Sequence, residues 1–255
     1  MVASRRRVAI TGSNGIIGAP LTANLTRDPD LEIVPVDRAR ADILDLPALR
    51  LAFAGSDAIV HLAGGVLRDG SFDEVWEPNL LGLRNVFTAA VETGCRRVIY
   101  TSSLHVLGMY EQERRPEIYA PVDKELLGTD VTVRPANPYA LTKACGELIA
   151  RYFSDVHGLL VTCVRIGTMN VADSPHIPDD AARQRLRDLP AQERRARLAA
   201  KWFSNADFAR LVRAILARDV PFSIVYGVGD NPGRYVDLES GRALFGFWPD
   251  DGAPT

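Results

Sequence analysis

The chain has 255 residues, which is enough for one α/β domain with a small appendage or for two compact domains. Apolar residues make up 47% of it and charged residues 24%, a composition that excludes disordered, collagen-like and coiled-coil chains. Thirty basic residues nearly balance thirty-two acidic ones, so the formal net charge of −2 favours neither nucleic acid nor an anionic membrane as a partner.

No apolar run reaches the roughly 18 residues that cross a bilayer. The basic N-terminus is followed only by the short apolar run Val8 to Ile10, too short for a signal peptide. The cysteines, Cys95, Cys145 and Cys163, are widely spaced and form no metal-ligand pattern. We therefore expect reduced thiols and a cytoplasmic protein that binds a small molecule, with no metal, nucleic acid or membrane as its partner.

Short β-rich runs alternate with longer segments of helical periodicity, the pattern of βαβ units that build a parallel sheet. The expected strands are Arg7–Thr11, Glu32–Val36, Ala58–Leu62, Arg97–Thr101, Leu160–Arg165 and Phe222–Tyr226. The expected helices are Ile16–Arg27, Pro47–Ala54, Phe72–Thr93 and Pro138–His157. Several of these strands are apolar on both faces, as in strands that helices cover above and below. The sequence therefore predicts an α/β fold with a doubly wound parallel sheet.

Two stretches interrupt this alternation. Residues 104–137 are polar and too long for a simple connection, which is typical of a lid or substrate wall, although an inert surface excursion fits as well. Residues 179–201 have helical periodicity and are rich in arginine, a pattern that for most of these side chains indicates a solvated helix face. The arginines are Arg183, Arg185, Arg187, Arg194, Arg195 and Arg197.

The first expected strand runs directly into a glycine-rich turn, Thr11-Gly12-Ser-Asn-Gly15-Ile-Ile-Gly18, which opens the first helix. The first glycine permits the tight turn, the second admits a pyrophosphate to the backbone, and the third lets the helix pack closely on the strand. N–H groups at the start of the helix then face the phosphates. In this strand–turn–helix setting the glycines predict a dinucleotide site, the alternative being glycines needed only for turns.

The second expected strand ends at Asp37, nineteen residues after Gly18, where a carboxylate can bind the hydroxyls of the adenosine ribose. The negative charge of Asp37 repels a 2′-phosphate, which favours NAD over NADP. The adjacent Arg38 could accommodate such a phosphate, so some use of NADP stays open. Asp42 and Ile43, just beyond, could flank the adenine.

Tyr139-Ala-Leu-Thr-Lys143 is the most specific signal, because the chain has only three lysines (Lys124, Lys143 and Lys201). Asn137-Pro138 is typical of a helix N-cap followed by proline, which places Tyr139 in the first turn. The i, i+4 spacing puts phenol and ammonium on one helix face, either as a reactive pair or as a surface pair on an amphipathic helix.

A reactive pair has a clear chemical use. A free tyrosine, with a pKa near 10, is a poor base at neutral pH. A neighbouring ammonium and the positive charge of an oxidised nicotinamide would lower the pKa of the Tyr139 phenol. This suits removal of a hydroxyl proton while hydride leaves the same carbon.

Two more polar residues fall at the carboxyl edge of the expected sheet, where ligands bind in doubly wound folds. Ser103, in Thr101-Ser102-Ser103 at the end of the fourth strand, could hydrogen-bond the reacting oxygen. Asn79 on the preceding helix either holds backbone or water near Lys143 or is an ordinary capping or core amide.

Together these segments resemble the extended short-chain dehydrogenase/reductase family, the NAD-dependent epimerases and dehydratases. The resemblance covers residues 7 to about 168 and is carried by Gly12-x-x-Gly15-x-x-Gly18, Asp37, Asp42-Ile43, His61-Leu-Ala63-Gly64, Asn79, Ser103, Tyr139-x-x-x-Lys143 and Arg165-Ile-Gly167. It implies a Rossmann fold, a bound NAD and a catalytic triad of Ser103, Tyr139 and Lys143. It also implies a homodimer formed by the 72–93 and 138–157 helices.

With this resemblance, residues 1–168 are expected to form the NAD-binding core. Residues 169–255 are expected to form a small substrate-binding portion whose 222–227 strand joins the core sheet. The expected cofactor-binding residues are Gly12, Asn14, Gly15, Ile16, Ile17, Gly18, Asp37, Arg38, Asp42, Ile43, Leu62, Ala63, Gly64, Asn79, Thr101, Tyr139, Lys143 and Ile166.

The short C-terminal portion favours a small substrate over a nucleotide sugar. Within the family, Ser102-Ser103-Leu104-His105 is similar to the Ser-Ser-Asn-His segment of uronate dehydrogenases. Arg197, followed by Trp202-Phe203-Ser204 and Asp207-Phe208, is similar to their segment whose arginine grips the substrate carboxylate. By that resemblance Ser103, His105, Tyr139 and Arg197 bind substrate, and the planar guanidinium fork suits a carboxylate. On its position alone, Arg197 would be an ordinary exposed helix arginine.

The leading hypothesis is an NAD-dependent dehydrogenase that oxidises a small, carboxylated, uronate-like sugar by hydride transfer, with NADP the less favoured cofactor. Leu104, which replaces the asparagine of uronate dehydrogenases, leaves the identity of the sugar open. An alternative is a nucleotide-sugar epimerase or dehydratase that keeps NAD bound and returns the hydride. A third hypothesis is a non-catalytic dinucleotide-binding regulator, which has no need for Tyr139 and Lys143 at this spacing.

Overall fold

The structure, a computed structural model, describes residues 5–66, 71–122, 124–176, 186 and 188–254. Within these residues a six-stranded sheet has the order β2-β1-β3-β4-β5-β6, and each strand is parallel to its neighbours. The strands are β1 (Arg6–Thr11), β2 (Leu31–Val36), β3 (Ala58–His61), β4 (Arg97–Ser103), β5 (Leu160–Ile166) and β6 (Phe222–Gly227). Every strand lies within two residues of its expected bounds.

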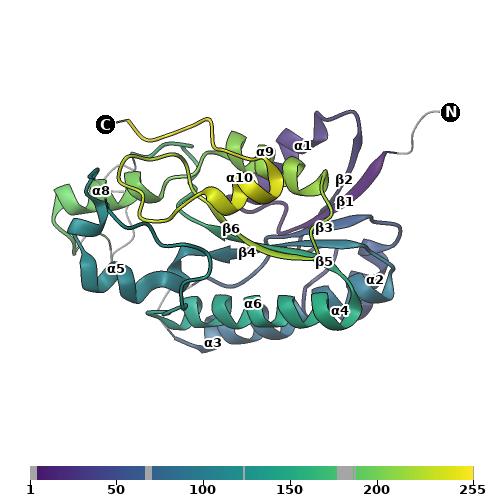
Figure 1. Cartoon of the computed structure of the whole chain (residues 1–255). Coiled ribbons are helices and arrows are strands. Elements are labelled where there is room, and N and C mark those ends of the chain that lie inside the picture. The colour runs from purple at the N-terminus through teal and green to yellow at the C-terminus, as the bar shows by residue number, and fades with distance from the viewer. Residues whose placement is uncertain (1–4, 67–70, 123, 177–185, 187, 255) are drawn as a thin grey trace.

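Helices cover both faces of the sheet (Figure 1). One layer contains α2 (Leu46–Phe53), α3 (Asp73–Trp76), α4 (Leu83–Glu92) and α6 (Pro138–His157). The other contains α1 (Gly18–Thr26), α9 (Asn205–Leu216) and α10 (Glu239–Phe245). Each layer buries its own apolar cluster against the strands, which is why the strands are apolar on both faces. The predicted doubly wound parallel sheet is confirmed.

The expected Phe72–Thr93 helix is divided into three segments. A π-helical turn, η1 (Glu77–Gly82), joins α3 to α4. Pro78 lies at the start of this turn and has no N–H to donate to the preceding turn of helix, so regular α-helical bonding fails there. Such wider turns interrupt helices mostly where a side chain has a specific task, and Asn79 lies in this one.

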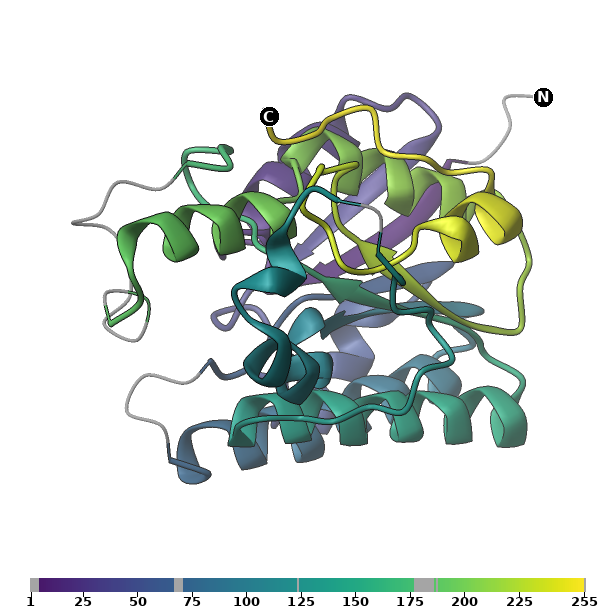
Figure 2. The same cartoon turned by 60° about the vertical axis from the view of Figure 1, so that its left-hand side comes forward.

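A third group of elements lies at the carboxyl end of the strands, at the left in Figure 1. The short turns and helices η2 (Leu104–Leu107), α5 (Gly108–Arg114) and η3 (Glu117–Tyr119) follow β4, and α8 (Ala191–Lys201) precedes α9. Figure 2 turns α5 and α8 towards the viewer. Residues of the 104–137 stretch, including Leu104 and Tyr119, belong to a third buried apolar cluster. The described part of this stretch is therefore partly packed into the fold and is not a simple surface loop.

A buried ion pair fastens α6 to the sheet. Arg165 on β5 donates through Nε and Nη2 to the two carboxylate oxygens of Glu147 on α6, each at 2.9 Å. Both side chains are buried, and Ser102 Oγ at the end of β4 donates to the same carboxylate at 2.6 Å. Glu147 lies one turn after Lys143, so this two-pronged pair fixes the helix that carries Tyr139 and Lys143.

Replacing Glu147 with alanine is expected to lower the free energy of unfolding by roughly 3–5 kcal/mol, because Arg165 would stay buried without its carboxylate. The matched control is Asp155→Ala on the same helix, whose ion pair with Arg151 is exposed on both sides. That change should cost at most about 1 kcal/mol. Chemical denaturation measures both values, and equal losses would contradict a special role for the Glu147–Arg165 pair.

Candidate active site

The glycine-rich turn after β1 can be built only from glycine at two positions. Gly12 has a φ of +68°, and a Cβ there would lie 2.8 Å from the backbone nitrogen of Ala63. A Cβ on Gly18 would overlap the carbonyl group of Gly12, to which Gly15 N donates at 3.0 Å. The backbone is therefore left bare where α1 begins, as a phosphate cradle requires.

The side chains between these glycines have separate places. Asn14 Nδ2 donates to the carboxylate of Asp37 at 2.6 Å and so links the turn to the end of β2. Ile16 is exposed, and Ile17 precedes the first residue of α1 and packs against the apolar cluster on that face. Of the three, only Asn14 joins the turn to another predicted cofactor residue.

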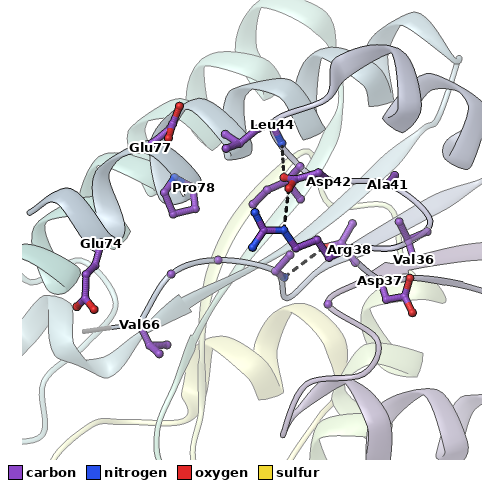
Figure 3. Close-up of a pocket in the computed structure, with 16 residues that line it drawn as sticks. Val36, Asp37, Arg38, Ala41, Asp42, Leu44, Val66, Glu74, Glu77 and Pro78 are labelled. Carbon is purple, nitrogen blue, oxygen red and sulfur yellow. Dashed lines mark hydrogen bonds and ion pairs between the residues drawn. The ribbon is translucent and has the colours of Figure 1, made fainter. Parts of the chain in front are cut away.

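A cavity of about 540 Å³ opens beside the turn (Figure 3). It is lined by Thr11, Gly12, Val36, Asp37, Arg38, Ala41, Asp42, Ile43, Leu44, Ala63, Gly64, Gly65, Val66, Glu74, Glu77 and Pro78. Seven of the predicted cofactor residues are in this lining: Gly12, Asp37, Arg38, Asp42, Ile43, Ala63 and Gly64. A bare glycine turn on one side and a carboxylate at the next strand end fit the phosphates and ribose of a dinucleotide.

The charges on the ribose side of this cavity favour NAD. Arg38 Nε lies 2.8 Å from a carboxylate oxygen of Asp42, and Leu44 N donates to the other oxygen at 3.0 Å (Figure 3). The Leu44 N–H, together with Arg38, holds the pKa of Asp42 below its usual range. Because Asp42 engages Arg38, and Asp37 stands beside it, a 2′-phosphate would meet two carboxylates here.

Lys143 is buried at the centre of the predicted catalytic group. Its Nζ donates to the carbonyl oxygen of Thr101 at 2.9 Å. It lies 5.8 Å from the centre of the Tyr139 ring and 5.0 Å from that of Tyr100. Burial lowers the pKa of Lys143 to about 8, so the ammonium is present at neutral pH but readily gives up its charge.

Asn79 holds the loop after β3 against α6. Its Oδ1 accepts from Gly65 N at 2.7 Å, and its Nδ2 donates to Gly65 O at 3.1 Å. The same Nδ2 donates to Thr142 Oγ1 at 3.0 Å, next to Lys143. Asn79 therefore holds backbone beside the lysine and caps no helix.

His105 lies next to both Ser103 and Tyr139, where β4 ends and α6 begins. Ser103 Oγ accepts from His105 N at 3.2 Å. Ser103 lies two residues after Thr101, whose carbonyl oxygen accepts from Lys143. Asn137 Oδ1 caps α6 by accepting from Ala140 N at 2.8 Å, which places Tyr139 in the first turn. The His105 and Tyr139 rings lie edge to face with centres 6.0 Å apart.

Polar bonds align the ends of the central strands beneath this group. Thr11 Oγ1 lies 2.8 Å from His61 Nδ1, and Thr101 Oγ1 donates to His61 O at 2.7 Å. Leu62 N donates to Thr11 O at 3.3 Å, and the predicted cofactor residue Ile166 is buried at the end of β5. Burial, reinforced by the charge of Lys143, lowers the pKa of His61 to about 3, so His61 is neutral at physiological pH.

A second cavity, of about 180 Å³, borders His105. It is lined by His105, Gly108, Glu111, Gln112, Arg115, Tyr119, Ala136, Asn137, Leu186, Leu189 and Arg197. Both further residues that the resemblance assigns to substrate, His105 and Arg197, line it. Arg197 is thus not the solvated helix arginine that its position alone suggested. Of the other arginines of this stretch, Arg183, Arg185 and Arg187 lie outside the described residues.

No motif in the sequence points to Glu111, yet it anchors this cavity. Its carboxylate lies 2.8 Å from Arg197 Nε and 3.1 Å from Lys201 Nζ, and it accepts from Tyr119 OH at 2.7 Å. Burial of Glu111, which is only 5% exposed, favours the neutral acid. Lys201 and Arg197 outweigh this cost and hold the pKa of Glu111 well below its usual range, so it is ionised. Among the described residues, no group of three or more His, Cys, Asp or Glu side chains could hold a metal ion.

Fold and site together define a Rossmann-fold protein with a dinucleotide cavity beside a Tyr–Lys pair. The model of the NAD dependent epimerase/dehydratase family matches residues 8–184. The NAD-dependent glucose-6-phosphate dehydrogenase of Haloferax volcanii is 32% identical over 260 residues, which cover 96% of this chain and 93% of that protein. The L-arabinose 1-dehydrogenase (NAD(P)(+)) of the same organism is 31% identical, with 98% of each chain covered. The protein belongs to the NAD-dependent epimerase/dehydratase family.

A solved structure agrees. A mutant of uronate dehydrogenase from Agrobacterium tumefaciens complexed with NAD has a TM-score of 0.74 and 26% identity, and covers 98% of this chain and 86% of that one. The predicted family, Rossmann fold and NAD-dependent enzyme class are confirmed by these comparisons. No helix of the described residues is long and apolar enough to span a membrane.

The burial of Lys143 predicts a specific pH dependence of stability. Its pKa is about 8 in the folded protein, whereas an unfolded lysine titrates near 10.4. Between these values the unfolded chain binds a proton that the folded protein has lost, so this residue adds stability as pH rises. From about pH 7 to about pH 10, we expect the wild type to gain about 2–3 kcal/mol in unfolding free energy relative to Lys143→Met.

Urea denaturation of both proteins at each pH measures this difference, from which the other titrating groups cancel. A difference that stays flat or falls with rising pH would show that the Lys143 ammonium is not desolvated.

Proposed function

We propose that this protein is an NAD-dependent dehydrogenase that oxidises the hemiacetal carbon of a small sugar. The observation that carries the proposal is the burial of Lys143 near Tyr139, close to Gly64 of the larger cavity and to His105 of the cavity of about 180 Å³. The relatives named above are dehydrogenases of a sugar phosphate, an aldose and uronates, which supports a sugar as the substrate.

Tyr139 is the proton acceptor in this proposal. The Lys143 ammonium, 5.8 Å from the centre of its ring, carries the positive charge that would stabilise the phenolate as the proton is transferred. One N–H of Lys143 is committed to Thr101 O, so two remain to hold Tyr139 and a ribose hydroxyl of the cofactor. NAD, when bound, supplies the acceptor for the hydride that leaves the carbon.

Ser103 and His105 position the sugar. Ser103 Oγ, at the end of β4, hydrogen-bonds the reacting oxygen and keeps it against Tyr139. The His105 ring lies edge to face with that of Tyr139 and also lines the smaller cavity, so in this proposal His105 contacts the sugar between its reacting end and the end that Arg197 faces. The small size of this cavity supports a monosaccharide over the nucleotide sugar of an epimerase or dehydratase.

Tyr139→Phe is expected to reduce NADH formation by about 10²–10⁴-fold, because it removes the phenolic oxygen that accepts the proton and keeps the rest of the side chain. The assay records NADH absorbance with aldopentoses, aldohexoses, their 6-phosphates and uronates, with NAD and NADP in parallel. NAD should support faster turnover than NADP, since Asp37 and Asp42 both face the adenosine ribose site.

The control is NAD binding to the Tyr139→Phe variant by calorimetry, which should be unchanged within about twofold. Undiminished turnover in this variant, or conversion of a nucleotide sugar without net NADH, would contradict the proposed dehydrogenase.

We also propose that the protein is a homodimer formed through α4 and α6. An open groove of about 900 Å³ between these helices is lined by Trp76, Leu80, Leu81, Arg84, Thr88, Val91, Glu92, Leu148, Ile149, Tyr152, Phe153 and His157. Leu148 is 73% exposed there, and Trp76 and Tyr152 are each more than half exposed. A largely apolar groove of this kind is typical of a surface that a partner covers.

Leu148→Arg is expected to convert the dimer to a monomer, because it places a charge in that largely apolar groove. The matched control is Leu51→Arg on α2, where the leucine is 82% exposed and lies away from the groove. Light scattering coupled to size exclusion gives the mass of each variant. A monomeric wild type, or dissociation by Leu51→Arg alone, would rule out this interface.

A further inference from the structure

We propose that Glu111 occupies the place that a substrate carboxylate would take, so that the site accepts an uncharged aldose and discriminates against uronates. The proposal rests on the dehydrogenase function proposed above and narrows its substrate class. It assigns a selective role to a residue of α5 that no motif marks.

The first observation is the geometry of Arg197. Its Nε lies 2.8 Å from Glu111 Oε1 and its Nη2 donates to Glu111 Oε2 at 3.2 Å. Two parallel N–H bonds from one edge of the guanidinium are the arrangement by which arginine grips a carboxylate. In this chain that edge is engaged by the protein itself, before any substrate arrives.

The second observation is that Glu111 cannot leave this position at low cost. Besides Arg197, it accepts from Tyr119 OH at 2.7 Å and from Lys201 Nζ at 3.1 and 3.2 Å. Glu111 and Lys201 are both buried, and Glu111 is held ionised by the two cations. Displacing it would strand a buried carboxylate and loosen the pairing of a buried ammonium. A substrate therefore meets the Glu111–Arg197 pair intact.

The third observation is that Glu111 and Arg197 both line the smaller cavity, as His105 does. A carboxylate at the far end of a sugar would lose its water in this cavity without gaining a two-pronged contact that offsets the loss, because Glu111 already holds that edge of Arg197. A hydroxyl at the same place costs less to desolvate, and one outer N–H of Arg197 is enough to satisfy it. The pair therefore favours –CH₂OH over –COO⁻.

Matched sugar pairs test the proposal in the wild type. Glucose and glucuronate, and likewise galactose and galacturonate, differ only in whether carbon 6 carries a hydroxyl or a carboxylate. We expect kcat/KM with NAD to favour the aldose of each pair by on the order of tenfold or more. A uronate used as well as its aldose would overturn the proposal. Turnover of an aldose 6-phosphate and of no other sugar would also overturn the proposal, because its negative charge is on carbon 6, as in a uronate.

Glu111→Gln tests the residue directly. Removing the charge makes the edge of Arg197 available to a substrate carboxylate, so the selectivity ratio should move towards the uronate by on the order of tenfold, chiefly through a lower KM. The matched control is Glu113→Gln on the same helix, whose exposed carboxylate pairs with Arg134. It should leave the ratio unchanged. A purely structural role for Glu111 would instead lower turnover of both sugars equally.

Glu111→Gln alone could fail to fold, because it leaves the buried Lys201 ammonium without this carboxylate. The double variant Glu111→Gln, Lys201→Met avoids this cost, because it removes one buried cation together with the anion. Thermal unfolding and NAD binding confirm that it is folded, and its selectivity should shift towards the uronate in the same direction. An unchanged ratio in this folded variant would reject the role of Glu111. Absence of NADH with every sugar, while NAD still binds, would instead reject the dehydrogenase function on which the proposal rests.

Discussion

The candidate active site depends on the buried pairing of Glu147 with Arg165, because this contact decides where α6 lies against the sheet. Lys143 is one turn before Glu147, and the ammonium reaches the Thr101 carbonyl only if the helix keeps this depth. That depth is also what removes water from Lys143 and lowers its pKa to about 8. The Glu147–Arg165 pair therefore determines both the position of Lys143 and its lowered pKa.

Asn79 imposes a second constraint from the opposite side. Its amide reaches both the backbone of Gly65 and the hydroxyl of Thr142, so it joins the loop that bounds the dinucleotide cavity to the helix that bears Lys143. A regular α-helical turn through Pro78 lacks the N–H that it would need, and the wider π-helical turn accommodates both the proline and the bonded amide. The π-helical turn thus lets Asn79 hold Gly65 of the cavity lining at a fixed distance from Thr142, next to Lys143.

What the sequence predicts well is what local geometry determines. Gly12 and Gly18 are required by a turn of a few residues, and Asn137 with Pro138 marks the first turn of α6, so Tyr139 and Lys143 can be placed without the rest of the fold. Contacts between distant segments have no such signature. Glu111 and Arg197 are 86 residues apart, and neither spacing nor periodicity relates them. The scarcity of lysine is the sequence feature that could point to this cluster. Lys201 lies one helical turn from Arg197 and pairs with the same carboxylate of Glu111.

The proposed function gives both ends of the site the same physical logic. At the adenosine end, the proposal places Asp37 where its carboxylate can accept from a ribose hydroxyl and would oppose a 2′-phosphate. At the far end of the proposed sugar site, Glu111 holds the edge of Arg197 with which a substrate carboxylate would otherwise pair. In the proposed function, a fixed acidic side chain therefore disfavours the charged analogue at each end. Because the Glu111 carboxylate is already paired with Arg197 and Lys201, the discrimination is built into the folded protein and needs no closure around the substrate.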